Sequence, residues 1–184
     1  ASLSLRAIAR EMKWTAPALY RYFPSRDALL ITLAATAYRS FADTLQAARD
    51  AAPADDRAER FFAIGMAYRK WALTHPQDYV LIFATRDPLI EESVDEVEVA
   101  GRRAFGVLIG ALNDLWEAGE INPAATYTEP SNVLQAQLNK MKKEYAIPVK
   151  TPVIHLALVV WSRVHGLVSL ELVGTLPGFL GDAE

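Results

Sequence analysis

Aromatic and basic side chains that suit contact with nucleic acid are concentrated near the start of the chain. Tyr20, Arg21 and Tyr22 are consecutive, and Arg26 follows shortly after them. Phenol and guanidinium groups donate hydrogen bonds to phosphate oxygens, and arginine also reads base edges in the major groove. The small side chains of residues 15–18 would let the backbone approach a thymine methyl. The candidate DNA-contact residues are Lys13, Thr15, Ala16, Pro17, Ala18, Tyr20, Arg21, Tyr22 and Arg26.

Two short helices joined by a tight turn are predicted to position these side chains. Residues 4–12 have apolar residues at helical spacing. Thr15 is a suitable N-cap for the next helix, Pro17 is tolerated in its first turn, and Pro24 ends it. Ser25 then caps a third helix. Two helices joined so tightly and followed at once by a third are typical of helix-turn-helix DNA binding. By composition alone, the same cluster could equally be core and solvated surface.

The rest of the chain is predicted to be helical, which makes the fold class all-α. The third helix keeps an apolar stripe to about residue 50, and a helix of that length could carry motion through the protein. A proline-containing boundary at 51–56 divides a helix-turn-helix domain at 1–50 from a ligand-binding and dimerisation domain at 51–184. Further helices are expected at 57–74, 77–84, 93–119, 131–145 and 152–173, with loops at 86–88, 121–130 and 147–152.

Composition and charge favour a regulator over an enzyme. The 184 residues include no cysteine, and the three histidines, at 75, 155 and 165, do not have metal-ligand spacing. There is no nucleophile elbow, phosphate-binding glycine loop or zinc-protease motif, so we expect no catalysis, metal or cofactor. The net charge is −3, yet residues 1–30 carry five basic and two acidic side chains. A basic end on an acidic body suits a protein that presents that end to phosphate.

The helix at 152–173 is apolar on every face and long enough to span a membrane. Arg163, His155, His165 and Glu171 lie inside it, and charge at mid-membrane is costly. We therefore expect no membrane association and a helix buried in the core or at a subunit interface, with Val153–Leu172 as the dimer helix. The absence of cysteine, and of a signal-peptide pattern in the first residues, favours the cytoplasm.

Aromatic and apolar side chains in the second domain could line a pocket for a small molecule. A largely apolar pocket between helices, with a few polar tips, suits a small hydrophobic or aromatic effector. Each of these side chains could also be ordinary core, and His165 could be a hydrogen-bonded interface histidine. The candidate ligand-binding residues are Phe62, Met66, Tyr68, Trp71, Tyr79, Phe83, Phe105, Ile109, Trp116, Trp161 and His165.

Two motifs resemble one family of bacterial regulators. The first consists of Ile8-Ala9, Thr15, Leu19-Tyr20, Tyr22-Phe23, Arg26-Asp27 and Leu29. It resembles the DNA-binding pattern of the tetracycline-repressor (TetR) family. The second, Trp161-Ser-Arg-Val-His165-Gly166, resembles the Trp-x-x-x-His-Gly (WHG) signature of one class of C-terminal domain in that family.

The resemblance implies roles for particular residues. It makes Tyr20, Tyr22 and Arg26 phosphate contacts and places Thr15, Ala16, Ala18 and Arg21 closest to the bases. It also implies a repressor rather than an activator, which a small hydrophobic effector releases from its operator. Because one helix-turn-helix rarely binds well alone, we expect a homodimer on a palindromic double-stranded DNA operator.

The chain departs from the family pattern at two places. Lys13 stands where the family has glycine, at a turn position that favours a left-handed backbone. The family's first helix would precede Ala1 and its last helix would follow Glu184, so we expect a portion of a longer regulator. The alternative function is a helical, dimeric small-molecule-binding or interaction protein that does not bind DNA.

Overall fold

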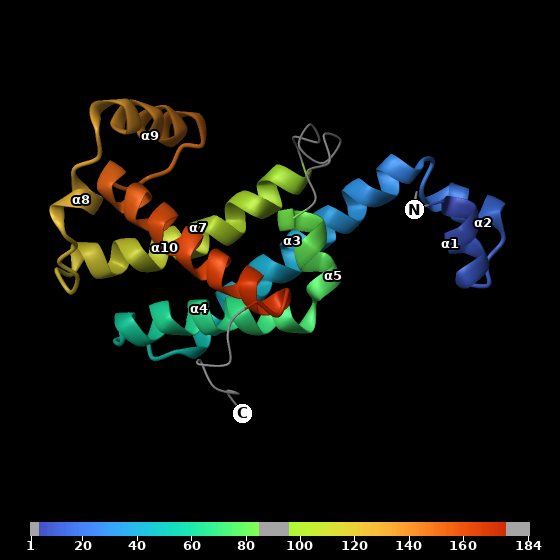
Figure 1. Ribbon diagram of the computed structural model, residues 1–184, viewed down its shortest axis with the longest axis horizontal. Coiled ribbons are helices and arrows are strands. Elements are labelled where there is room, and N and C mark those ends of the chain that lie inside the picture. The colour runs from blue at the N-terminus through green and yellow to red at the C-terminus, as the bar shows by residue number, and fades with distance from the viewer. Residues whose placement is uncertain (1–3, 85–95, 176–184) are drawn as a thin grey trace.

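The computed structural model describes residues 4–84 and 96–175, and every regular element within these ranges is a helix (Figure 1). The all-α prediction is therefore confirmed. The N-terminal helices are α1 (Leu5–Glu11), α2 (Ala16–Tyr22) and α3 (Arg26–Ala51). The remaining helices are α4 (Arg57–Thr74), α5 (Pro76–Tyr79), the π-helix η1 (Val80–Ala84), α7 (Glu96–Glu117), α8 (Ala125–Thr128), α9 (Asn132–Glu144) and α10 (Thr151–Leu172).

Helices α1 and α2 and the first turns of α3 form a small head, and the starts of α2 and α3 follow local side-chain chemistry. The Thr15 hydroxyl accepts a hydrogen bond from the Ala18 amide at 3.3 Å, and the Ser25 hydroxyl accepts one from the Ala28 amide at 3.0 Å. Such caps satisfy backbone donors that a helix leaves unpaired at its first turn. The head has its own core, made of Leu5, Ala9, Leu19 and Leu29.

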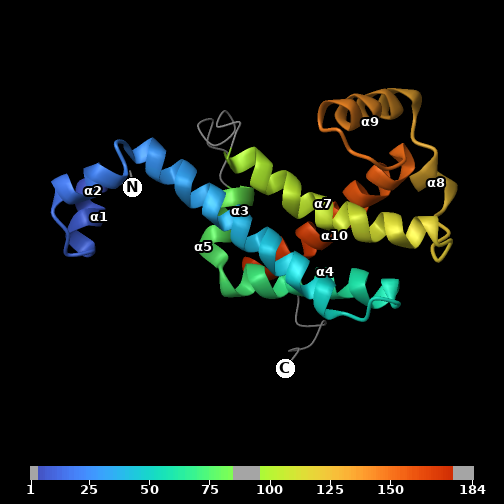
Figure 2. The ribbon, with the colours of Figure 1, turned by 180° about the vertical axis from the view of Figure 1, so that it is seen from behind.

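The long helix α3 connects this head to the body. The head and the α8–α9 region lie at opposite ends of the molecule in both views (Figures 1 and 2). Along the body, α3 packs against α7 and α4. A Cβ added at Gly101 of α7 would lie 3.4 Å from the ring of Tyr38 on α3, at ordinary van der Waals distance, so this ring packs directly against α7.

Aromatic side chains from several helices meet in the core of the body. The Phe41 ring of α3 lies 4.9 Å from the Trp71 ring of α4 and 5.6 Å from the Phe83 ring of η1, between centroids. A second apolar cluster, which includes Ile109 and Val153, joins α7 to the start of α10. These two clusters position the helices that surround the cavity described below.

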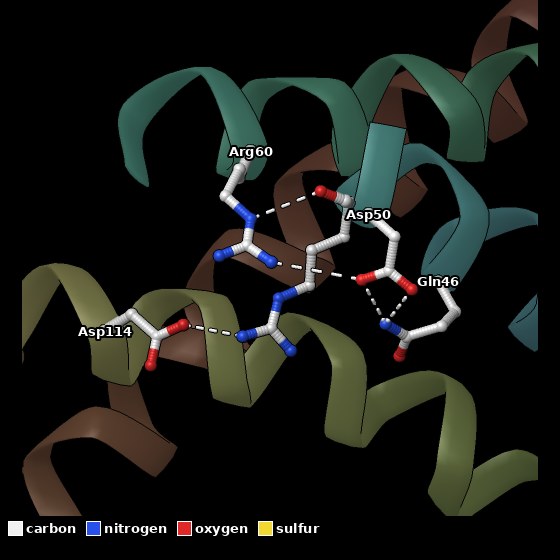
Figure 3. Close-up of polar contacts among 5 residues, drawn as sticks. Gln46, Asp50, Arg60 and Asp114 are labelled. Carbon is white, nitrogen blue, oxygen red and sulfur yellow. Dashed lines mark hydrogen bonds and ion pairs between the residues drawn. The ribbon is translucent and has the colours of Figure 1, made fainter. Parts of the chain in front are cut away.

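A polar network fixes the last turns of α3 against α4 and α7 (Figure 3). Arg49 donates from Nη2 to Oδ2 of Asp114 at 2.6 Å, and Arg60 donates from Nε to the Arg49 carbonyl oxygen at 3.2 Å. Gln46 donates from Nε2 to the carboxylate of Asp50, which lies 3.9 Å from Nη2 of Arg60. The end of α3 is thus held on two sides.

Within the described residues, the helix bounds agree closely with the sequence prediction. Residues 121–130, predicted as a loop, include the single turn α8. The predicted loop at 86–88, the expected start of the fifth helix at 93 and the chain beyond 175 lie outside the described residues. On α4, the face with Ile64, Tyr68 and Trp71 is buried, whereas Phe62 and Met66 on its other face are exposed.

Candidate functional site

The exposed face of α2 presents the side chains predicted to contact DNA. Leu19 is 2% exposed and faces the core of the head, while its neighbours Tyr20 and Arg21 are exposed. Tyr22 is 67% exposed. Of the small residues, Thr15 and Pro17 are exposed, and Ala16 and Ala18 are half-buried. The helical period therefore separates one anchoring side from one side open to a partner.

The turn between α1 and α2 has the left-handed backbone that was predicted at Lys13, where the family has glycine. Lys13 has a φ of 55°, in the left-handed region. Its amide donates to the Arg10 carbonyl at 3.1 Å, and the Trp14 amide donates to the Ala9 carbonyl at 2.8 Å. This pair of bonds is a Schellman motif, whose left-handed position usually holds glycine. Lysine there costs about 1 kcal/mol.

Trp14 is a surface residue of the head that the sequence analysis did not single out. It is exposed, and its ring lies 5.8 Å from the Tyr22 ring between centroids. The exposed Lys13 precedes it in the turn. At the start of α3, the exposed Arg26 lies 3.7 Å from the Asp27 carboxylate. The predicted contact residues therefore come from α2, the turn before it and the start of α3.

A cavity of about 800 Å³ lies between α3, α4, α7 and α10 in the body. Its wall is mainly aliphatic and aromatic, and Phe83 of η1 and Met141 of α9 complete it. The volume is within the range of pockets that hold drug-sized ligands. The predicted ligand-binding residues that line it are Phe62, Met66, Tyr68, Phe83, Phe105 and Trp161.

Five other predicted ligand-binding residues are not part of the wall. Trp71 is buried between α3 and α4, where its Nε1 donates to the Ser40 hydroxyl at 3.1 Å. Ile109 and Trp116 belong to the apolar cluster between α7 and α10. Tyr79 and His165 lie behind the lining rings. Helical spacing identifies these residues as apolar-face residues but does not distinguish wall from core.

Hydrogen bonds behind the wall hold two of its rings in place. The imidazole of His165 stacks on Trp161 at 4.9 Å between centroids, and the Tyr68 hydroxyl lies 2.8 Å from Nδ1 of His165. The Tyr79 hydroxyl lies 3.1 Å from the same nitrogen and 2.6 Å from the Ser169 hydroxyl. Burial lowers the pKa of His165 and raises that of Tyr68, so both are neutral near pH 7. His165 is thus a positioning residue for the wall.

The lining residues that the sequence analysis did not predict include Tyr38, Phe41, Arg69 and Glu171. Tyr38 and Phe41 come from α3, where their helical spacing is the same as that of core residues. Arg69 and Glu171 also line the cavity, and they join α4 to α10 through two hydrogen bonds, one of them 2.8 Å from Nε to Oε2. The hydrogen bonds to Glu171 raise the pKa of Arg69 above its ordinary value.

Comparison with known proteins identifies the family at both ends of the chain. Residues 1–33 match the model of bacterial regulatory proteins of the tetR family, and residues 61–184 match the tetracyclin repressor-like C-terminal domain. The chain belongs to the TetR family. The head is thus its helix-turn-helix domain, and the WHG motif lies within the matched C-terminal region.

Relatives of this TetR-family chain include regulators from mycobacteria. It is 32% identical to the HTH-type transcriptional regulator Rv1816 of Mycobacterium tuberculosis and to Mb1846 of Mycobacterium bovis, over the whole chain and 81% of each relative. The crystal structure of SCO4313, described as a regulatory protein, is 36% identical, with a TM-score of 0.72 over 97% of this chain and 77% of that one. A protein of unknown function from Rhodococcus sp. RHA1 is 25% identical, with a TM-score of 0.71 over 96% and 75%.

The TetR-family assignment makes the chain a transcriptional regulator rather than an enzyme. Helix α10 has the length and hydropathy of a membrane span. Its polar residues nevertheless bond within the fold, since Arg163 donates to the Tyr127 hydroxyl at 2.8 Å and Glu171 pairs with Arg69. Among the described residues, no group of three or more potential ligands could hold a metal ion.

Replacing Lys13 with glycine is expected to stabilise the head by about 1 kcal/mol, because glycine adopts the left-handed conformation without a Cβ penalty. Hydrogen exchange of the α1 and α2 amides should slow accordingly. Ala146, the other described non-glycine residue with a positive φ (50°), provides the matched control. Ala146→Gly should slow exchange in α9 only. Unchanged exchange in the head of Lys13→Gly would contradict the strain assigned to this turn.

Proposed function

We propose that this chain is a ligand-responsive repressor that a small hydrophobic or aromatic effector releases from its operator. The observation that carries the proposal is the path of α3. This helix starts at the DNA-binding head, and its side chains Tyr38 and Phe41 line the cavity. A ligand in the cavity therefore contacts the same helix that carries the head.

Coupling between the two sites requires that the ligand bind one orientation of the head better than another. Tyr38 provides a specific connection for such a preference. Its hydroxyl donates to the Ile82 carbonyl in η1 at 2.9 Å, and its ring faces Gly101 of α7. A ligand that displaces Tyr38 would disturb the contacts of α3 with both elements. The π-helix itself is a conformation found often at functional sites.

On the DNA side, we assign the contacts to the exposed face of the head. Tyr20, Tyr22 and Arg26 contact phosphates, whereas Arg21 and the small residues at 15–18 lie closest to the bases. Lys13 adds a positive charge at the turn. With few long polar side chains on α2, much of the affinity comes from phosphate contacts and DNA shape, and it falls steeply with salt.

Replacing Arg21 with alanine is expected to weaken operator binding by about 1–3 kcal/mol, because a base or phosphate contact is lost. Fluorescence anisotropy with labelled operator DNA measures the change. Arg39→Ala is the matched control, since it removes the same charge from an exposed position of α3 beyond the head. Equal affinities for wild type and Arg21→Ala would remove Arg21 from the interface.

We also propose a homodimer through α10, acting on a palindromic operator in the cytoplasm. On this helix Leu167 is 54% exposed and Leu170 is exposed as well, and so is Val173 directly after the helix. A second copy would cover this apolar surface and give two heads for two half-sites. Light scattering tests the assembly, and a stable monomer at micromolar concentration would contradict it.

The WHG class and the boundary between domains, at residues 50 and 51, belong to the same proposal. The stacking of His165 on Trp161, one turn apart, gives the class signature a structural purpose. The boundary lies just before the last residue of α3, a helix that both domains share.

A DNA shift assay with the full-length gene product and its own upstream region tests the function directly. A thermal-shift screen of small apolar compounds would supply candidate ligands. Retardation of the DNA that such a ligand reverses would support the proposal. Retardation of no duplex would favour the alternative of a small-molecule-binding protein that does not contact DNA.

A further inference from the structure

The charged groups that line the cavity neutralise each other. Among the described lining residues, Arg69 and Glu171 are the charged ones. Arg69 donates from Nε to Oε2 of Glu171 at 2.8 Å and from Nη2 to Oε1. This arrangement is bidentate, the geometry in which a guanidinium and a carboxylate bind most strongly. The wall therefore presents a dipole rather than a net charge.

The hydroxyl groups of the wall also have partners within the protein. Tyr38 donates to the Ile82 carbonyl at 2.9 Å, and the Tyr68 hydroxyl lies 2.8 Å from Nδ1 of His165. Of the other described lining residues, Gly65 and Gly101 have no side chain, Trp161 carries an indole N–H, and the rest have apolar side chains. The described wall therefore has no charge or hydroxyl group that needs a ligand to complete its bonding.

From these contacts we infer that the cavity selects uncharged apolar ligands, and that the Arg69–Glu171 pair sets this selectivity. The inference rests on the proposed function, which it makes more specific. A carboxylate ligand would lose its hydration on entry and could gain a counter-ion only by displacing Glu171 from Arg69. An ammonium ligand would have to displace Arg69 from Glu171. Either exchange leaves one charge without its partner at a site only partly open to water, since the side chains of Arg69 and Glu171 are 38% and 26% exposed, and this is unfavourable.

Single substitutions should therefore change the selectivity in opposite directions. Glu171→Gln removes the carboxylate charge and leaves Arg69 free to bind an anionic ligand. Arg69→Gln leaves Glu171 free to bind a cationic one. The double variant has no charge at this position and should return to uncharged ligands. Glu117→Gln is the matched control, because it breaks an ion pair with Lys150 at 3.0 Å between residues outside the described cavity wall.

The experiment displaces the neutral fluorescent probe N-phenyl-naphthylamine from the dimer or monomer as purified, at pH 7. The competitors share one naphthalene ring and carry a hydroxymethyl, carboxylate or aminomethyl group at the same position. For wild type and Glu117→Gln, we expect the alcohol to bind at least about tenfold more tightly than either ion. Naphthoate should gain about tenfold on Glu171→Gln only, and naphthylmethylammonium should gain about tenfold on Arg69→Gln only.

Each outcome decides either the selectivity or the function. Wild type that binds an ion as tightly as the alcohol overturns the inference, whatever the variants do, and leaves ligand-responsive regulation intact. If the alcohol binds more tightly than both ions, the inference is supported. If operator affinity is then unchanged when the alcohol is bound, the proposed release from DNA is overturned. Absence of binding by the probe and all three competitors overturns both.

Discussion

Replacing Leu19 with alanine is expected to abolish operator binding while the body stays folded. Leu19 is 2% exposed and packs with Leu5, Ala9 and Leu29 in the separate core of the head. Truncating a buried leucine costs about 2–5 kcal/mol, and a cluster this small has little stability to lose. Since Leu19 is outside the apolar clusters of the body, the helices around the cavity should keep their packing.

Two measurements separate these effects. An operator titration should show loss of binding, and hydrogen exchange should show fast exchange in α1 and α2 with unchanged protection in α4, α7 and α10. Leu33→Ala is the control, because it removes the same atoms from an exposed position of α3. If Leu19→Ala kept operator affinity, the head would owe its shape to something other than this core.

Replacing Trp71 with alanine should have the complementary effect and destabilise the body by about 3–5 kcal/mol. Trp71 is 2% exposed, its ring lies 4.9 Å from that of Phe41, and its Nε1 donates to the Ser40 hydroxyl. The substitution leaves a void between α3 and α4 and a hydroxyl without its donor, and both effects lower the free energy of unfolding.

Urea unfolding followed by circular dichroism measures this loss. Phe62→Ala removes an aromatic ring from the same helix at a position that is 61% exposed, so it should change the unfolding free energy far less. Trp71→Phe should fall between the two, because it keeps part of the buried ring. Equal stabilities for Trp71→Ala and Phe62→Ala would contradict the central position of Trp71 in the core.

The local elements of this fold could be predicted from the sequence because their causes are local. Thr15 and Ser25 cap helices through amides three residues away, and Pro24 lies in the short break between α2 and α3. The left-handed backbone at Lys13 could be predicted from the resemblance to the family pattern, which has glycine at this turn position. Short elements are the exception: the single turn α8 has too few residues to show a period.

The cavity was harder to predict because its wall comes from distant segments. Arg69 and Glu171 are 102 residues apart, so no spacing in the sequence indicates that they pair. Tyr38 and Phe41 share an apolar stripe with core residues of α3, and that stripe alone does not show which side chains border empty space. Trp71 was assigned to the pocket for the same reason, since it lies on one face of α4 with the lining residue Tyr68.

Because α3 is one continuous helix, any insertion or deletion within it rotates the head relative to the body. An α-helix turns by about 100° and rises about 1.5 Å per residue. One residue inserted between Leu33 and Tyr38 would therefore swing the exposed face of α2 by about a quarter turn around the axis of α3. Both domains could remain folded, yet the two heads of the proposed dimer would no longer fit the major groove at two half-sites together. The number of residues in α3 therefore sets the orientation of the head relative to the body, in addition to what its side chains contact.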